Sequence, residues 1–382
     1  MAMAETPTPR RRRRSRLARE LTSSQATAAA RGTSASSIYI EAGPGSGKTM
    51  VSAARFGVLR FRASEDRGVL ALSFTRAATA ELSRRVRMLW GPTCLRWPNR
   101  IETLDKLLLD LLHDLLEGGL ILWPGGATEL QVFDSWAALA QQAWTSVGYA
   151  LVADGDALVA QVQFEGTSRQ RVPGSIVVPL LRAGACTHDD VRAVMALALD
   201  RPDCQDRIRR RLAESFRSVI VDEVFDANEL DLRVVELMLQ SGIGTTLVGD
   251  PWQALYVFRG ATPDAVRELM LRHAIARADL TESFRWKTEA QRSLAADLRA
   301  GSPVAIEVAQ PDEAVDVALS STWKPLWNLG SEVLPLAFGS FKGGYEEAGA
   351  TLLLHYFASV GGEQYFGRQY SHHGLVGSML TR

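Results

Sequence analysis

The chain has 382 residues, 46% of them hydrophobic, which is enough apolar surface for two or three cores and excludes a disordered protein. Its 43 basic and 43 acidic residues balance, so a global electric field toward nucleic acid or membrane is excluded and any such affinity must be local. The apolar runs are shorter than the ~20 residues of a membrane helix, and the three cysteines have neither metal nor disulfide spacing. We therefore expect a soluble, cytoplasmic protein with no membrane partner.

The first segment of the chain is strongly basic. Residues 1–20 contain two prolines and seven arginines, a composition that predicts a disordered arm. The arm could contact phosphates or be a plain solvated tail, and both interpretations stay open. A short alanine-rich helix is expected after Leu21. On it, Gln25 could recognise an adenine edge with its amide, although a lone glutamine on a helix usually faces solvent.

The stretch Ile38–Thr49 is typical of a phosphate-binding loop. Strand residues run into a glycine-rich loop that ends in Lys48 and Thr49, and a helix is predicted over Met50–Arg62. Backbone N–H groups of such a loop converge on a triphosphate, the lysine reaches the β and γ phosphates, and the hydroxyl ligates Mg²⁺. Ala42 replaces the first glycine of the strict pattern. The ATP-binding residues predicted from this loop are Ala42, Gly43, Pro44, Gly45, Ser46, Gly47, Lys48 and Thr49.

A second β–α unit and a long insertion follow. Gly68–Thr75 is a continuous apolar run typical of a strand buried on both faces, and a helix should continue to Arg87. Leucines at helical spacing predict another helix over Lys106–Leu116. We interpret residues 106–212 as a helical insertion. Its further predicted helices are Gln131–Tyr149, His188–Leu199 and Cys204–Glu214.

The sheet resumes beyond the insertion. Ser218–Glu223 and Thr245–Asp250 are apolar strands ending in carboxylates, a helix is expected over Asp264–Ala276, and Leu280–Phe284 is a further strand candidate. Five strand signals separated by helices predict an α/β fold in which helices flank a parallel sheet.

Two adjacent carboxylates suit nucleotide hydrolysis. Ligands bind at the carboxyl edge of open α/β sheets, and Asp222 and Glu223 end a strand there. We expect Asp222 to hold Mg²⁺ and Glu223 to polarise the attacking water. An exposed Asp-Glu pair is common and usually has no function, but this one follows an apolar strand downstream of a phosphate loop.

The order of the motifs resembles the UvrD/Rep/PcrA-like superfamily 1 DNA helicases, whose motor is RecA-like. The resemblance covers roughly residues 21–286. The stretches similar to family motifs are Leu21–Gln25 (Q motif), Ala42–Thr49 (Walker A), Leu72–Leu82 (Ia), Val221–Asn228 (II), Val248–Ala261 (III) and Leu280–Arg285 (IV).

The resemblance implies a role for each matching residue. Gln25 would recognise adenine and Phe284 would stack on it, Arg285 would reach the γ phosphate, and Gln253 would sense hydrolysis. Together with Glu223, the residues Gln253 and Arg285 would be catalytic. The resemblance also implies an ATP hydrolase moving 3′ to 5′ on single-stranded DNA in DNA repair. Its implied DNA-binding residues are Phe74, Thr75, Arg76, Thr103, Tyr256 and Phe258, with core packing as the alternative for the aromatic rings.

Some positions depart from the family pattern. Phe225 replaces the glutamine of motif II, which removes a polar contact between hydrolysis site and motor. Asp105 stands where motif Ib has histidine, and motif Ia has Arg76 and Ala77 in place of asparagine and lysine.

The domain organisation implied by the resemblance has a RecA-like domain over residues 21–105 and 213–283. Residues 284–382 would then be a partial second RecA-like domain or a C-terminal segment, because motifs V and VI are not recognisable there. We therefore expect a truncated motor, incomplete on its own, for which a partner protein could supply these motifs. The alternatives are a P-loop ATPase that acts as a conformational switch and a silent remnant that binds nucleotide or DNA without turnover.

Overall fold

The computed structural model describes residues 21–304 except 34, 64, 135–147, 155–156, 164–173 and 255–259. The chain divides into two units, residues 1–303 and 304–382, and the fold described below is that of the first. The basic arm, the aromatic positions Tyr256 and Phe258 and the segment after 304 lie outside the described residues. Among the helices that are described, none is both long and apolar enough to cross a membrane.

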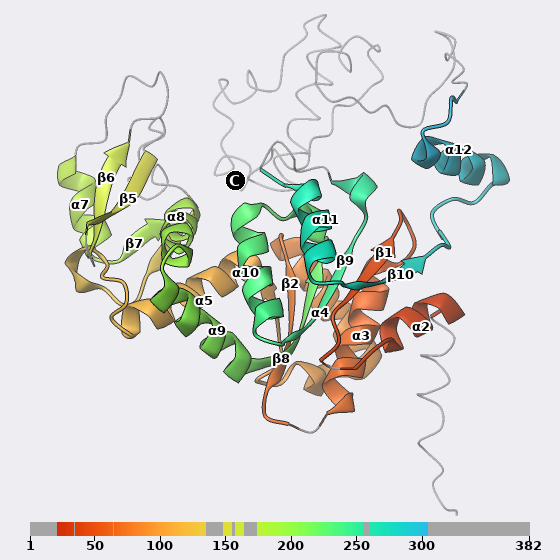
Figure 1. The fold of residues 1–382 in the computed structure, drawn as a ribbon, viewed down its shortest axis with the longest axis horizontal. Helices are drawn as coiled ribbons and strands as arrows, with labels where there is room; N and C mark the ends of the chain where they lie inside the picture. The colour runs from red at the N-terminus through yellow and green to blue at the C-terminus, as the bar shows by residue number, and fades with distance from the viewer. Residues whose placement is uncertain are drawn as a thin grey trace, which may run out of the picture. The chain divides into compact units, whose positions relative to one another are not determined.

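A six-stranded parallel sheet is the centre of this unit (Figure 1). Its strand order is β10-β1-β9-β8-β2-β3, so the strand before the phosphate loop is separated from the strand before Asp222 by one neighbour. The predicted RecA-like α/β fold is confirmed. The strands are β1 (Ile38–Ala42), β2 (Gly68–Ser73), β3 (Arg100–Thr103), β8 (Phe216–Asp222), β9 (Gly244–Gly249) and β10 (Ala276–Leu280).

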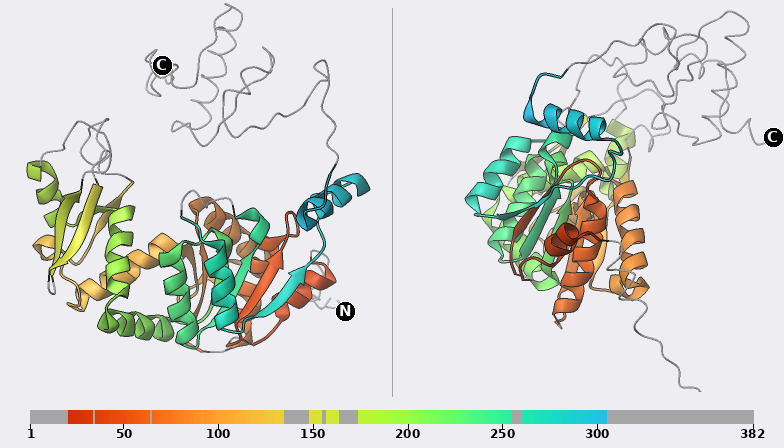
Figure 2. Two further views of the ribbon diagram at one scale, coloured as in Figure 1. Left: turned by 45° about the horizontal axis from the view of Figure 1, so that its top comes forward. Right: turned by 90° about the vertical axis from the view of Figure 1, so that its right-hand side faces the viewer.

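Helices cover both faces of the sheet, because its central strands are apolar on both sides. Every residue of β2, β8 and β9 is buried, the pattern expected of parallel strands between two helical layers. Figure 2 shows the sheet between these layers in its right-hand view. The helices of the first layer are α2 (Ser23–Ala30), α3 (Lys48–Arg62) and α4 (Arg76–Trp90). Those packed with the opposite face are α5 (Leu104–Glu117), α9 (Pro202–Ser215), α10 (Glu229–Gln240) and α11 (Pro263–Arg272), while α8 (His188–Leu199) packs against α5, α9 and α10.

A fully buried arginine ties α2 to the sheet. Arg55 of α3 has an exposed fraction of 0%, and burial lowers its pKa to about 10. Its guanidinium donates to the hydroxyl of Thr246 on β9 at 2.6 Å and to the carbonyls of Ala29 and Arg31 at 3.2 and 2.8 Å. These hydrogen bonds from Arg55 satisfy carbonyls at the end of α2, where helix carbonyls lack partners within the helix.

The insertion contains strands as well as helices. Its β4 (Gln131–Phe133) and β7 (Ala185–Thr187) form a parallel pair, and β5 (Gly148–Asp154) and β6 (Ala157–Gln163) an antiparallel one. The predicted helix over Gln131–Tyr149 is therefore wrong at both ends, because Val132 and Phe133 favour a strand once a partner strand is present. Among the described residues of the insertion, a further helix is α7 (Gly174–Arg182). The predicted helix His188–Leu199 matches α8, while the domain boundaries stay a prediction.

Both edge strands of the main sheet differ from the sequence prediction. β3 was not predicted, because it is four residues long and contains charged Arg100 and Glu102. The last strand lies at Ala276–Leu280, four residues earlier than predicted, and α11 ends at Arg272. The cause is a turn between these elements, where Ala274 has a left-handed φ of 47°. The helix α12 (Glu289–Ala300) follows β10.

Candidate ATP site

The predicted nucleotide site lies at one edge of the sheet, where the parallel strands end. Because all six strands run in the same direction, the segments that follow them emerge at a common edge. The segments concerned are the loop Gly43–Gly47 after β1, Asp222 and Glu223 at the end of β8, Asp250 after β9 and Thr281–Arg285 after β10.

The phosphate loop has the backbone that its glycines predict. Gly45 and Gly47 have left-handed φ angles of 75° and 85°, and α3 begins at Lys48. Gln25 is only 4% exposed and supports this loop: its side-chain amide donates to the carbonyl of Ser46 at 2.7 Å. The oxygen of the same amide accepts from the backbone N–H of Thr22 at 2.9 Å. Gln25 thus lies against the phosphate loop and not in solvent, while its contact with adenine stays a prediction.

Lys48 connects the two residues assigned to water activation and to sensing. Its Nζ donates a hydrogen bond to Oε1 of Gln253 and lies 3.7 Å from Oε1 of Glu223. Gln253 ends the 3₁₀ turn Pro251–Gln253 after β9, and Glu223 follows β8 directly. Three residues that the sequence places up to 205 positions apart therefore meet at a single ammonium group.

The carboxylates of the site carry more negative charge than Lys48 neutralises. Burial, and next the charge of Glu223, raises the pKa of Asp222 to about 7. Burial, and next Glu223, likewise raises the pKa of Asp226 to about 6. An oxygen of Asp226 is buried without a hydrogen-bond partner. A site with this excess of carboxylate oxygens favours a cation.

This donor set fits Mg²⁺. Magnesium binds through one or two protein oxygens together with phosphates and water, so Asp222 and the Thr49 hydroxyl are sufficient. Within the described residues no group of three or more His, Cys, Asp and Glu side chains could hold a metal, and a Mg²⁺ site of this type does not require one.

Glu223 has a strained backbone. Its φ and ψ are 56° and 44°, a left-handed conformation that is rare outside glycine and costs about 1–3 kcal/mol. The conformation begins the 3₁₀ turn Val224–Asp226, and it places the backbone N–H of Glu223 3.2 Å from Oδ1 of Asp222. Strain of this kind is found at catalytic positions, where the surrounding structure maintains it.

The segment after β10 lies along the phosphate loop. The backbone N–H of Phe284 donates to the carbonyl of Gly45 at 2.9 Å, and the Ser283 hydroxyl donates to the carbonyl of Pro44 at 2.6 Å. A Cβ atom added to Gly45 would be 2.4 Å from Cβ of Arg285, so only glycine allows this approach. The structure therefore brings Phe284 and Arg285 to the loop, while their contacts with adenine and the γ phosphate stay predictions.

One arginine at this site was not predicted from the sequence. Arg299 of α12 makes an ion pair with Asp250 through two hydrogen bonds of 2.9 and 3.0 Å. No sequence pattern indicated the contact, because 49 residues separate the partners and α12 has no motif of its own.

Of the residues assigned to DNA, the structure describes four, two of which cap helices. Thr75 and Thr103 cap α4 and α5, each accepting a hydrogen bond from a backbone N–H, at 3.1 and 3.2 Å. Arg76 is exposed at the start of α4, whereas Phe74 is half-buried against the core. Phe74 and Thr75 line a cavity of about 130 Å³. DNA contact by these four residues stays a prediction, as it does for Tyr256 and Phe258.

An arginine of the insertion accounts for the unusual Asp105. Arg192 of α8 donates to the carboxylates of both Asp105 and Asp231, and Asp231 is 2% exposed. Asp231 also caps α10, accepting from the backbone N–H of Asn228 at 3.0 Å. The departure from the family pattern at Asp105 is therefore compensated by a cation that joins the insertion to the sheet domain.

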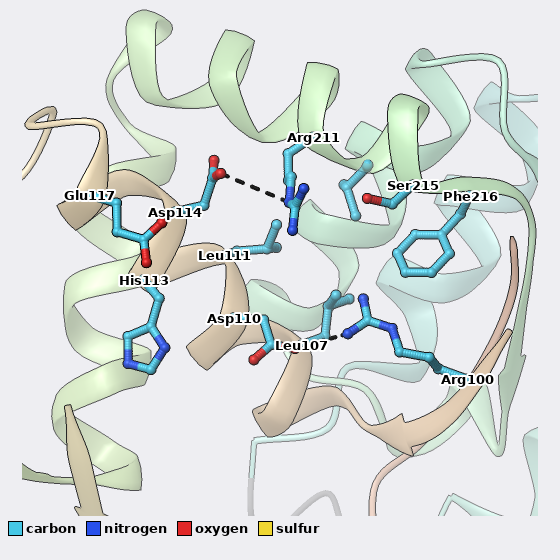
Figure 3. Close-up of a pocket in the computed structure, with 11 residues that line it drawn as sticks. Arg100, Leu107, Asp110, Leu111, His113, Asp114, Glu117, Arg211, Ser215 and Phe216 are labelled. Carbon is cyan, nitrogen blue, oxygen red and sulfur yellow. Dashed lines mark hydrogen bonds and ion pairs between the residues drawn. The ribbon is translucent and has the colours of Figure 1, made fainter. Parts of the chain in front are cut away.

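A further cavity of about 290 Å³ lies away from these residues (Figure 3). It opens between α5 and α9, where β3 begins at Arg100 and β8 at Phe216. Figure 3 shows Asp114 facing Arg211, and their charged atoms are 3.8 Å apart. None of the predicted site residues lines this cavity, which lies where the strands start and not where they end.

A family model supports the assignment made from geometry. The model of an AAA domain matches residues 25–259, more than half of the chain. The chain belongs to this AAA-domain family. The matched range of the AAA domain runs from Gln25 through the phosphate loop and the carboxylate pair to the turn that holds Gln253.

Two of the similar curated proteins are named as DNA helicases and a third as a subunit of RecBCD enzyme. The chain is 27% identical over 248 residues to ATP-dependent DNA helicase Rep of Escherichia coli, a match covering 58% of this chain and 35% of the relative. It is 27% identical over 259 residues to ATP-dependent DNA helicase UvrD1 of Mycobacterium leprae, covering 59% and 33%. It is 34% identical over 79 residues to the RecBCD enzyme subunit RecB of Mycolicibacterium smegmatis, covering 21% and 7%. The AAA domain is thus of the UvrD/Rep-like superfamily 1 type, and the matches span about a third or less of these relatives' lengths.

Proposed function

We propose that the chain binds ATP with Mg²⁺ at the carboxyl edge of the sheet and hydrolyses it as the motor module of a DNA helicase. The observation that carries this proposal is the contact of Lys48 with both Glu223 and Gln253 beside a glycine-rich loop. Lysine, carboxylate and amide in this arrangement serve phosphate binding, water activation and sensing of the bound phosphate.

Each residue has a task in the proposed reaction. The loop N–H groups and Lys48 hold the phosphates, and Asp222 with Thr49 holds the metal, which neutralises charge on the phosphate oxygens. Glu223 orients a water molecule toward the γ phosphorus and accepts its proton. Arg285 approaches the same phosphate, while Gln25 and Phe284 contact the adenine. The position of Phe284 and Arg285 against Gly45 supports this part of the proposal.

Single-stranded DNA is the proposed second ligand. The names of the relatives support it, since Rep and UvrD1 are DNA helicases. Phe74, Thr75 and Arg76 would contact the strand, with movement from 3′ to 5′ and a role in DNA repair. The similarity to a RecBCD subunit supports, within this proposal, work alongside a partner protein.

Substitution of Lys48 tests the nucleotide part. The thermal stability of the wild-type chain should rise with ATP and Mg²⁺ as RT ln(1 + [L]/Kd), which is about 2.7 kcal/mol at a hundredfold excess over Kd. Lys48→Ala should lose most of this gain. Lys106→Ala is the matched control, because Lys106 is exposed and pairs with Asp110 on α5. An equal ATP-dependent shift in Lys48→Ala would refute the site.

The ATPase rate tests the motor and its DNA ligand. We expect slow hydrolysis by the wild-type chain that a single-stranded oligothymidylate accelerates, with the acceleration declining as salt increases. Hydrolysis that is indifferent to DNA would favour a conformational switch. Nucleotide binding without any hydrolysis would mark a silent binding module.

A further inference from the structure

Arg299 is held in a fixed orientation by Asp250. Nη1 donates to Oδ2 at 2.9 Å and Nη2 donates to Oδ1 at 3.0 Å, so the guanidinium and the carboxylate face each other in a plane. The Asp250 side chain is fully buried, with an exposed fraction of 0%. Two parallel charge-assisted hydrogen bonds specify orientation as well as charge. Arginine therefore points in a defined direction here, which a lysine would not do.

The guanidinium lies over the first glycine of the phosphate loop. A Cβ atom added to Gly43 would be 3.1 Å from Nη1 of Arg299, so a side chain at position 43 would press on it. Beside Arg299 opens a cavity of about 560 Å³, which Gly43 and Pro44 also line. The guanidinium thus has open space on the side of Gly43 and Pro44, although neither Lys48 nor Glu223 lines this cavity.

Arg299 and Lys48 are linked through one short turn. Asp250 precedes the 3₁₀ turn Pro251–Gln253 and accepts the backbone N–H of Trp252 at 3.1 Å through its carboxylate. The carbonyl of Asp250 accepts the backbone N–H of Gln253 at 2.9 Å, and the side chain of Gln253 accepts from Lys48. The two bonds to Asp250 use two of the five N–H groups of a guanidinium. Nη2 also lies 3.9 Å from Oε1 of Glu41, so a ligand at this edge would share the guanidinium with two carboxylates.

We propose that Arg299 is a second arginine for the γ phosphate of bound ATP, positioned by Asp250 and supplied by the chain itself. This inference rests on the proposed ATPase function. In the reaction, water forms a bond to the γ phosphorus and gives its proton to Glu223. The bond from the γ phosphorus to the bridging oxygen breaks, which releases ADP and inorganic phosphate. Arg299 stabilises the negative charge on the transferred group, a contribution that pre-oriented donors make during the reaction itself.

Three variants test this role. For Arg299→Ala, single-turnover ATP hydrolysis should fall about 10²-fold to 10³-fold. Its affinity for ADP should stay within about twofold of wild type. Its preference for ATP over ADP should fall about tenfold, because a tenfold change in affinity corresponds to the loss of one hydrogen bond to a charged group. Arg299→Lys should lie between wild type and Arg299→Ala, because a lysine keeps the charge without the planar geometry. Arg292→Ala is the matched control, since Arg292 lies on the same helix, lines the same cavity and pairs with Glu289.

The comparison of ATP with ADP separates catalysis from simple attachment of α12. If Arg299 only attaches the helix, Arg299→Ala will weaken both nucleotides equally or leave hydrolysis unchanged, and either result overturns the inference. Arg299→Ala leaves the buried Asp250 carboxylate without its cation and could therefore destabilise the chain. The double variant Arg299→Ala/Asp250→Asn removes this unpaired charge. It should regain thermal stability but not the preference for ATP. A wild-type chain that binds no ATP would refute the proposed function instead.

Discussion

Arg192 should be a large single contributor to the stability of the sheet domain. It is the cation for Asp231, whose side chain is 3% exposed, and the Arg192 side chain itself is 23% exposed. Removal of one partner of a buried ion pair costs about 3–5 kcal/mol, because the remaining charge has no counterion. Asp231 keeps the backbone N–H of Asn228 at 3.0 Å, so we expect the lower part of that range or slightly less, about 2–3 kcal/mol, for Arg192→Ala.

The cost should depend on pH in a defined direction. Burial raises the pKa of Asp231, whereas Arg192 lowers it, so the pKa rises further in Arg192→Ala. A carboxyl group with a raised pKa keeps its proton in the folded state, and its stability contribution is lost as pH rises through that pKa. The destabilisation in Arg192→Ala should therefore be smaller at pH 5 than at pH 8.

Urea unfolding of the full chain, followed by tryptophan fluorescence, measures both effects. Adding Asp231→Asn to Arg192→Ala removes the unpaired charge and should restore most of the lost stability. Arg233→Ala is the control, because Arg233 pairs with Asp200, which is 68% exposed, and such a surface pair contributes about 0–1 kcal/mol. A loss for Arg192→Ala no larger than that of Arg233→Ala, or one independent of pH, would contradict this account of the ion pair.

Two further predictions concern the carboxylates Glu223 and Asp222. Glu223→Gly should stabilise the chain by about 1 kcal/mol, because glycine adopts the left-handed backbone without strain. The same substitution should abolish hydrolysis, because it removes the carboxylate. A thermal melt without nucleotide measures the stability, and destabilisation would show that the backbone with a φ of 56° is not strained. Since the pKa of Asp222 is raised to about 7, its folded form binds a proton that the unfolded chain has already lost, and stability should decline as pH rises from about 4 to 7. In Asp222→Asn this decline in stability with pH should be smaller, which urea unfolding midpoints measured at several pH values without Mg²⁺ would show. An equal pH dependence of the midpoint in the wild type and the variant would contradict the burial of this charge.

The sequence was sufficient to predict the centre of the fold, where the burial of strands on both faces decides the pattern of residues. Strands such as Gly68–Ser73 are buried on both faces and are therefore nearly continuous in apolar residues, a pattern visible without a partner strand. The edge strand β3 and the strand β4 of the insertion depend on pairing, because their residues have no strong periodicity of their own. Strand propensity is decided by such neighbours, which a single sequence does not show.

The candidate site also has parts that the sequence predicts and parts that only the folded chain shows. The phosphate loop and the Asp222–Glu223 pair are local patterns, and the structure places them at one sheet edge as expected. The contacts of Arg299 with Asp250 and of Arg192 with Asp231 join residues 49 and 39 positions apart, so only the folded chain shows them. The two hydrogen bonds that Gln25 makes to Thr22 and Ser46 were equally invisible, although Gln25 itself was selected.

The buried guanidinium of Arg55 has a consequence for how nucleotide would enter. If α2 detached from the sheet, Arg55 would lose the carbonyls of Ala29 and Arg31 while still enclosed by apolar side chains, and a buried cation without such acceptors costs several kcal/mol. Opening of α2 by itself is therefore rare compared with fraying of an ordinary surface helix, and α2 belongs to the same cooperative unit as β9. Gln25, which supports the phosphate loop through Ser46, is consequently in place before any ligand arrives, so the entropy of ordering it is lost during folding and not during binding.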